Sequence, residues 1–271
     1  VLAIPAHHPL AAKKGVVGLG EIVDEEFVFF SRSEAPVKLD GELDEACWQS
    51  AAVITDFRRQ FPVDTGLASA RTELRMSFDD HHLYIGAVCW QPRSDYTIQS
   101  LKRDFAAGTS DVLNLLLSPS KDGLNGFLFG VSPLNVQREA LIDNGTTQSY
   151  EWDNRWESVV RNHDDRWVLE VAIPFKTLRY SVLPGENTWK VNFVRTRIKN
   201  WEVSTWHPVP QQFPPNNLAF TGTLVWNAPP PKPGANIALI PYVTGGWSQE
   251  TRRDRNSLEV LEKKVDWTRN A

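Results

Sequence analysis

Carboxylates are the residues of this sequence whose spacing first suggests a reaction. Hydrolysis of a glycosidic bond uses two of them, about 5 Å apart in retaining enzymes and about 6.5–9.5 Å apart in inverting ones. Two neighbouring segments, QREALIDNG and YEWDN, supply the candidates: Glu139, Asp143, Glu151 and Asp153. Acidic residues in turns are mostly solvated or capping groups, so we favour that role over catalysis. If the protein is an enzyme, a pair of such carboxylates would make it a hydrolase acting on O-glycosyl bonds. The chain has no GxSxG, HExxH or P-loop motif.

Aromatic side chains suggest a second chemistry, the stacking of sugar rings. The chain has 11 Trp and 13 Phe, and aromatic residues are enriched in strands and in flat binding faces. The C–H face of a pyranose packs on an aromatic plane while polar groups satisfy the hydroxyls. Trp152, Trp201 and Trp206 lie beside polar residues near expected turns. We take them as candidate ligand contacts, with Trp201 and Trp206 as the best exposed pair.

Charge and cysteine content narrow the class of protein. The 271 residues carry a net charge of −4 and a pI near 5.9, so we expect no nucleic-acid partner. Cys47 and Cys89 have no metal-type spacing, and we predict two buried thiols rather than a disulfide framework. The sequence contains no apolar run of about twenty residues, so we predict no membrane-spanning helix. The opening stretch VLAIPAHHPLAA is either the tail of a cleaved signal peptide or a disordered arm.

The elements that position these residues are predicted to be short strands. In RTELRMSF, Leu74, Met76 and Phe78 share one face, and with the DDHH turn and LYIGAVCW they predict a hairpin. Similar strands follow in DVLNLLLS, NGFLFGV, RWVLEVAIP, WKVNFVRTR and LAFTGTLVW. Helix is limited to residues 43–49 and 175–178. This pattern predicts an all-β fold, an antiparallel β-sandwich. Three tryptophans fit the core face of its strands: Trp156, Trp167 and Trp189.

The chain divides into four segments on this interpretation. Residues 1–35 form an N-terminal arm with an edge strand, and residues 36–227 form the sandwich. Residues 228–234 contain APPPKPG, which is typical of a stiff polyproline linker. Residues 235–271 contain two strand-like stretches, 236–247 and 258–268, with the polar loop QETRRDRN between them.

Four strings in the sandwich segment resemble the family 9 carbohydrate-binding modules. They are VKLDGELDEACW, MSFDDHHLYIGAV, VLEVAIPFKTLR and AFTGTL, in that order along the chain. The resemblance implies a β-sandwich that holds a sugar between two aromatic faces, with charged side chains on the hydroxyls. Gly108 and Thr109 stand where the family has one aromatic face, and Phe213 is nearest to the second. Asn114 and Gly130 stand where it has an acidic and a basic group, so most of the family's sugar contacts are absent.

A narrower resemblance concerns the context of the domain. The stretch from SDVLNLLLSPSKDGLNGFLFGV through YEWDNRWES to TWHPVP is similar to a group of bacterial proteins in which such a module precedes an outer-membrane β-barrel. In that group IALIPYVTGGW and residues 258–270 correspond to the first barrel strands. The resemblance implies an exported protein at the outer membrane, with a periplasmic sandwich, its own barrel as partner and a barrel truncated at Ala271. A free-standing hairpin is the alternative.

Relatives in family 9 also carry calcium, which implies a structural calcium ion here. The oxygen donors to inspect are Asp79, Asp80, Asp111 and Asp143, although no spacing matches a defined calcium loop.

Three functions follow from these observations. The first is non-catalytic binding of a glycan or another envelope ligand by an outer-membrane-associated protein. The second is a structural or partner-docking domain of an outer-membrane barrel, which the altered sugar contacts favour. The third is an accessory to a glycan-processing hydrolase in carbohydrate catabolism, which fold alone does not establish.

Overall fold

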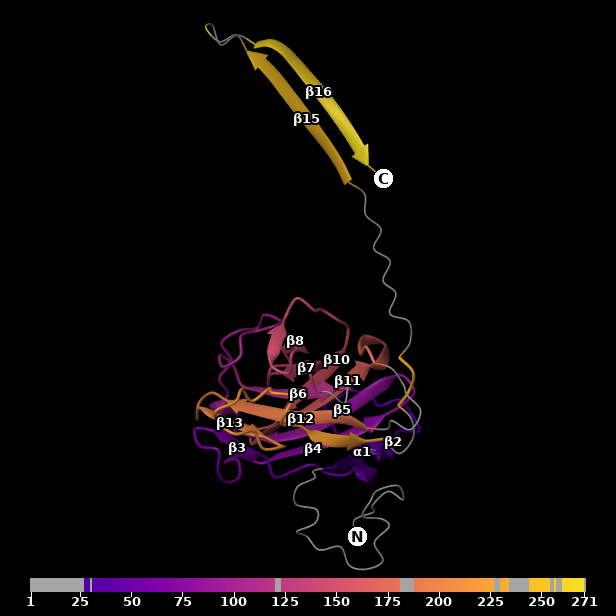
Figure 1. Cartoon of the computed structure of the whole chain (residues 1–271), viewed down its shortest axis with the longest axis vertical. Helices are drawn as coiled ribbons and strands as arrows, with labels where there is room; N and C mark the ends of the chain where they lie inside the picture. The colour runs from indigo at the N-terminus through magenta and orange to yellow at the C-terminus, as the bar shows by residue number, and fades with distance from the viewer. Residues whose placement is uncertain are drawn as a thin grey trace, which may run out of the picture. The chain divides into compact units, whose positions relative to one another are not determined.

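A computed structural model describes residues 27–29, 31–119, 123–180, 188–226, 230–233, 244–253, 256 and 260–270. The chain falls into two compact units, Val1–Gly234 and Ala235–Ala271. The first unit contains two β-sheets packed face to face, and the second is a β-hairpin (Figure 1). Of the predicted N-terminal arm and edge strand, residues 1–35, residues 1–26 and residue 30 lie outside the described residues.

The smaller sheet of the sandwich has five strands in the spatial order β10-β11-β5-β4-β2. Their bounds are β10 (Glu157–Asn162), β11 (Arg166–Pro174), β5 (His82–Trp90), β4 (Thr72–Phe78) and β2 (Ser31–Arg32). The predicted hairpin is confirmed, because β4 and β5 pair in antiparallel register through the turn at Asp79. β2 runs parallel to β4.

The larger sheet has nine strands. Its main path is β1 (Phe27–Phe29), β14 (Gly222–Val225), β12 (Thr188–Arg197), β6 (Val112–Ser118), β7 (Gly126–Val131), β8 (Gln137–Asp143) and β9 (Thr147–Ser149). Two strands branch from it, since β13 (Glu202–Thr205) pairs with β12 and β3 (Arg58–Phe61) pairs with β13. β1 and β14 are parallel, and the other pairs are antiparallel. The all-β sandwich predicted from the sequence is therefore confirmed.

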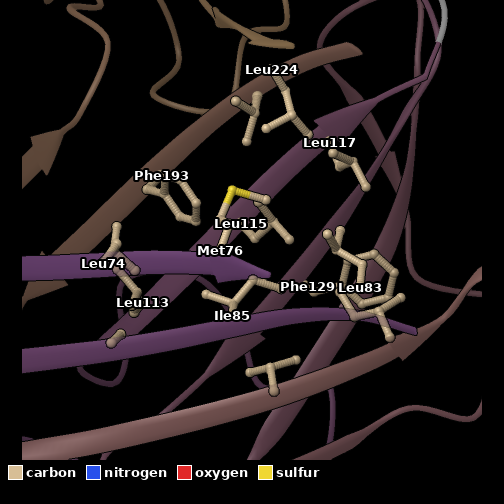
Figure 2. Packing of buried hydrophobic residues seen from close by; sticks show 14 of the residues in the cluster. Leu74, Met76, Leu83, Ile85, Leu113, Leu115, Leu117, Phe129, Phe193 and Leu224 are labelled. Atoms are coloured by element: carbon tan, nitrogen blue, oxygen red, sulfur yellow. The ribbon is translucent and has the colours of Figure 1, made fainter. Parts of the chain in front are cut away.

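The core lies between the inner faces of the two sheets. Leu74 and Met76 of β4 and Ile85 of β5 pack toward Leu115 of β6 and Phe193 of β12 (Figure 2). Alternation of apolar residues along each strand delivers these side chains to one side, as their period of two requires. The three tryptophans predicted for the core are buried: Trp156, Trp167 and Trp189. Cys47 and Cys89 are buried free thiols, as predicted.

The motif VKLDGELDEACW is fixed to the smaller sheet by one buried carboxylate. Glu170 of β11 accepts hydrogen bonds from the backbone N–H groups of Asp40 and Gly41, at 2.8 and 2.7 Å, and from Trp48 Nε1 at 3.1 Å. Gly41 has a φ of 83°, which favours glycine in this turn. Burial raises the pKa of Glu170 to about 7, although the three N–H donors act in the opposite direction.

Helix is scarce, as expected. Among the described residues, the helical segments are α1 (Ala46–Ser50) and two short 3-10 turns, η3 (Arg93–Asp95) and η4 (Phe175–Thr177). Within the described part of the chain, no helix has the length and apolar character needed to span a membrane.

The second unit consists of β15 (Thr244–Arg253) and β16 (Val260–Asn270), paired antiparallel. The prediction of a loop at QETRRDRN is wrong in its first half, because residues 249–253 belong to β15. Glu250 and Thr251 lie opposite Lys264 and Lys263, so charged and polar residues pair across the strands. The part of the predicted strand at residues 236–243 lies outside the described residues.

Candidate functional site

The outer face of the larger sheet carries the positions that correspond to the expected sugar contacts. Paired residues on neighbouring strands point to the same side of a sheet. Leu115 and Phe129 are partners that face the core, so Asn114 and Gly130, the adjacent pair, face outward. Arg138 of β8 is the partner of Gly130 and continues this row.

Gly130 provides the space in which two polar side chains lie. A Cβ atom at this position would be 2.3 Å from Asn114 Oδ1 and 2.6 Å from Arg138 Cγ. The basic group that the resemblance places on β7 is absent there, and an arginine from the next strand takes up the same space. The sequence analysis did not identify Arg138. The signal that could have found it is the period of two in QREALID, which places Arg138 on the same face of the strand as Ala140 and Ile142.

The surroundings of Arg138 are unusual for a buried cation. The side chain is 1% exposed, and its guanidinium carbon lies 5.4 Å from the ring centroids of both Phe105 and Tyr150. Its Nη2 donates to Tyr150 Oη at 2.5 Å, and this hydroxyl donates to Gln148 Oε1. No carboxylate of the described residues pairs with Arg138, and its Nε has no hydrogen-bond partner there. A buried charge with so few partners is costly, which favours a role beyond packing.

Three buried polar atoms without partners lie in one row across this face. They are Arg138 Nε, Asn114 Oδ1 and Thr205 Oγ1. Gly130 alone separates Arg138 from Asn114, whereas the buried side chain of Val194, the partner of both Asn114 and Thr205, lies between those two. Buried polar groups in native proteins nearly all have a partner, either protein or water. A ligand rich in hydroxyl groups, or ordered water, would supply both the donors and the acceptors that this row lacks.

The exposed tryptophan pair predicted from the sequence is wrong in one member. Trp201 is 66% exposed in the turn after β12, where its φ is 48°. Trp206 is only 7% exposed and packs on Phe193 in the core, with ring centroids 6.3 Å apart. Residues two apart along a strand point to the same side, so Trp206, just after β13, points inward as the buried Ser204 does.

The other two predicted aromatic contacts differ in exposure. Trp152 is half-buried, with its ring centroid 5.3 Å from Phe127 and 5.8 Å from Phe129, so it borders the core. Phe213 is 38% exposed and packs on Phe220 at 4.8 Å.

Phe61 is an exposed aromatic residue near Trp201 that the sequence analysis missed. Phe61 at the end of β3 is 41% exposed and is the partner of Val203, which lies two residues after Trp201. Gln60, its neighbour, donates through Nε2 to the Phe213 carbonyl oxygen at 3.0 Å. The segments that carry Trp201, Phe61 and Phe213 therefore meet around β3 and β13. Nothing in the short segment RRQF marked this strand in the sequence.

The four aspartates considered for calcium are not brought together. Asp79 accepts hydrogen bonds from the backbone N–H groups of His81 and His82 and from Tyr84 Oη, and Asp80 pairs with Arg32 at 2.6 Å. Partial burial opposes ionisation of Asp79, but these hydrogen bonds outweigh it and its pKa lies below the ordinary value.

The other two aspartates lie in the larger sheet. Buried Asp111 accepts from Gln91 Nε2 and from the N–H groups of Thr97 and Ile198, and Asp143 is exposed at the end of β8. Across the residues that the structure describes, no group of three or more His, Cys, Asp or Glu side chains could hold a metal ion.

Two of the candidate catalytic carboxylates, Glu139 and Asp153, meet at one arginine, Arg103. Glu139 is not a solvated turn residue, because it is fully buried and accepts hydrogen bonds from Arg103 Nη2 at 2.5 Å and Trp156 Nε1 at 2.9 Å. Arg103 also lies 3.6 Å from Asp153, which is 81% exposed. Asp143 and Glu151 are exposed. Glu139 thus anchors the 150–156 segment to β8, which is a structural role.

Comparison with solved structures identifies the fold. A family 9 carbohydrate-binding module from Caldicellulosiruptor kristjanssonii in complex with cellotriose matches with a TM-score of 0.54 and 14% identity, over 80% of this chain and 99% of that one. A family 9 module from the same organism in complex with glucose matches with a TM-score of 0.52 and 14% identity, over 74% and 95% of the two chains. A Bacteroides uniformis protein to which carbohydrate binding is ascribed matches with a TM-score of 0.56 and 13% identity. The match covers 74% of this chain and 98% of that one.

No protein-family model and no curated protein matches the sequence. The structural matches define the class: the chain contains a sandwich with the fold of a carbohydrate-binding module. Within that class, its fold is like that of the family 9 modules, in agreement with the resemblance found in the sequence.

Proposed function

We propose that the sandwich binds a glycan without catalysis, through the outer face of the larger sheet. The observation that carries this proposal is the row of buried polar atoms without partners, Arg138 Nε, Asn114 Oδ1 and Thr205 Oγ1. The likeness of the fold to modules solved with cellotriose and glucose supports it.

Each group in the row has a chemical role toward a sugar. The Asn114 Oδ1 and Thr205 Oγ1 atoms accept hydrogen bonds from hydroxyl groups, and Arg138 donates to hydroxyl oxygens. Trp201 and Phe213 at the rim provide apolar planes for the C–H faces of pyranose rings. Tyr150, 39% exposed above Arg138, is the side chain whose displacement would open the row to a ligand.

Titration of the whole chain with cellotriose and with glucose tests the proposal. Calorimetry and amide NMR shifts are expected to show binding, with perturbed signals from Asn114 and Thr205. Trp201→Ala and Phe213→Ala are each expected to weaken binding about fivefold or more, as loss of an aromatic contact does. Trp247→Ala is the matched control, because Trp247 is 64% exposed on β15 in the other unit. Binding that neither Trp201→Ala nor Phe213→Ala weakens would contradict the assignment of this face.

The non-catalytic part of the proposal has its own test. Glu139 already serves Arg103 and Trp156, so we expect no release of reducing sugar from cellulose or xylan by the purified protein. Release that Glu139→Gln abolishes would show a hydrolase instead.

One observation favours a second candidate, a structural or partner-docking domain. Phe105 and Tyr150 enclose the Arg138 guanidinium and leave it 1% exposed, as in a closed structural cluster. This candidate predicts no perturbation at Asn114 with any sugar, and cross-links between the exposed aromatic residues and another protein of the cell envelope.

We extend the proposal to the cellular location, an exported protein at the outer membrane with the sandwich in the periplasm. The sequence resemblance to modules that precede an outer-membrane barrel supports it, and the β15–β16 hairpin is compatible with it. Fractionation of cells expressing the full-length gene is the test, and recovery of the protein in the cytoplasm would contradict it.

A further inference from the structure

A groove lies on the opposite side of the sandwich, on the outer face of the five-stranded sheet. It encloses about 380 Å³, which is at the lower end of the range of small-ligand sites. Val88 and Trp90 of β5 form its floor. Its walls come from the segment around α1, from β4 and from the start of β11: Leu43, Trp48, Gln49, Ala51, Val53, Glu73, Arg75 and Arg166.

The fold holds this groove open by packing α1 at one end. Gly86, two residues before Val88, lets Leu43 and Trp48 lie on the sheet, since a Cβ there would be 2.7 Å from Leu43 Cδ2. Toward Trp90 the sheet is not covered in this way, and Val53 on the wall is 46% exposed. The result is an apolar floor that remains open to solvent beside a well-packed helix.

The floor offers an aromatic plane with cations around it. Trp90 is half-buried, and the guanidinium carbon of Arg71 lies 4.7 Å from its ring centroid. The Arg71 side chain is 65% exposed, and Glu73 is its ion-pair partner. A ligand that takes the place of Arg71 on the ring exchanges one stacking partner for another.

Two further arginines in the groove have little to bind within the protein. Arg75 has a 3.7 Å ion pair to Glu73 and no hydrogen bond within the described residues, although its side chain is only 21% exposed. Arg166 pairs with Asp165, its chain neighbour, whose side chain is 62% exposed. With Arg71, these residues set three guanidinium groups against two carboxylates, Glu73 and the exposed Asp165, and this excess of positive charge complements a negatively charged ligand.

We propose that this groove is a second binding site, and that its ligand is an acidic saccharide unit, a pyranose that carries a carboxylate. The sugar ring would pack on Trp90 and Val88, while the carboxylate would take the unused donors of Arg75 and Arg166. Glu73, with an oxygen near each of two arginines, would accept a hydrogen bond from a ring hydroxyl. The site is separate from the proposed glycan-binding face, which lies on the larger sheet.

Calorimetry with tetragalacturonate, its methyl ester and cellotetraose tests the second site. The acidic oligosaccharide is expected to bind, and its uncharged ester and the neutral cellotetraose to bind this groove at least tenfold more weakly. Arg75→Gln and Trp90→Ala should each raise the Kd for tetragalacturonate about tenfold. Arg166→Gln is the variant to use if Trp90→Ala lowers the melting temperature strongly. Arg179→Gln, at an exposed arginine outside the groove, is the control and should leave the Kd unchanged.

The outcome is separable from that of the first proposal. Trp201→Ala should leave tetragalacturonate binding intact, whereas Arg75→Gln should leave cellotriose binding intact. Failure of the whole chain to bind tetragalacturonate at millimolar concentration would overturn the acidic-saccharide site. Binding that neither Arg75→Gln nor Arg166→Gln weakens would overturn it equally.

Discussion

Glu170 and Arg138 are buried charged residues on the outer faces of opposite sheets, and they differ in how completely they are satisfied. Glu170 is fully buried, and both of its oxygens accept N–H groups, from Asp40, Gly41 and Trp48. Arg138 is 1% exposed, has a tyrosine hydroxyl as its one hydrogen-bond partner within the described residues, and leaves its Nε without any.

The difference separates a structural charge from a candidate binding group. Glu170 ties a sequence-distant turn and helix to β11, so its partners are parts of the fold itself. Arg138 lies between two aromatic rings, and across Gly130 it approaches Asn114, whose Oδ1 also lacks a partner. Satisfied buried groups specify a structure, whereas unsatisfied ones require a ligand or water.

Removal of Glu170 should have the largest effect on the fold. Glu170→Ala leaves three buried donors without an acceptor and detaches the turn that leads to α1, so we expect a loss of about 3 kcal/mol or more in the free energy of unfolding. Urea denaturation measures this loss. Glu157→Ala, at an exposed glutamate on the neighbouring β10, should change stability by less than about 0.5 kcal/mol. Equal effects of the two substitutions would show that Glu170 is not an anchor.

The pH dependence of stability should identify the same carboxyl. Burial raises the pKa of Glu170 to about 7 in the folded protein, above the unfolded value of about 4.5. The folded state therefore holds this proton more tightly, and the stabilisation is complete below pH 4.5 and is lost as the pH rises to about 7. The loss is roughly 3 kcal/mol for a shift of this size. Denaturation series of the parent protein and Glu170→Gln should differ in slope within that window, and parallel slopes would contradict the raised pKa.

Two strand glycines extend the comparison to packing. At Gly86 a Cβ would meet the flexible end of Leu43 at 2.7 Å, whereas at Gly130 it would meet Asn114 Oδ1 at 2.3 Å and the stem of Arg138 at 2.6 Å. We expect Gly86→Ala to cost less than about 1 kcal/mol and Gly130→Ala about 2 kcal/mol, since Leu43 can move and the buried Arg138 stem cannot. Thermal unfolding measures both variants. A larger loss of stability for Gly86→Ala than for Gly130→Ala would show that Gly86, and not Gly130, is the more crowded position.

The sequence predicted the parts of the molecule that depend on alternation along a strand. The β4–β5 hairpin and the buried Trp167 follow from a period of two within one segment. Arg138 could not be placed beside Gly130 in this way, because their contact depends on the register of β7 against β8. Trp206 was placed wrongly because its direction depends on the register of β13 against β12, which brings it onto Phe193. The groove was equally hidden, since its floor and walls come from four distant segments.

Replacement of Arg138 by an apolar residue of similar length should have the smallest effect on stability and a large effect on function. Arg138→Met keeps much of the stem between Phe105 and Tyr150, and it removes a buried charge that no carboxylate compensates within the described residues. Because such a charge is costly to bury, we expect stability to change by no more than about 1 kcal/mol, in either direction. Cellotriose binding should nevertheless weaken at least tenfold, since the charged donor at one end of the row is lost. Urea denaturation and calorimetry on the same variant measure the two effects. A variant that unfolds easily would place Arg138 with Glu170 among the structural charges, and one that binds cellotriose normally would remove it from the site.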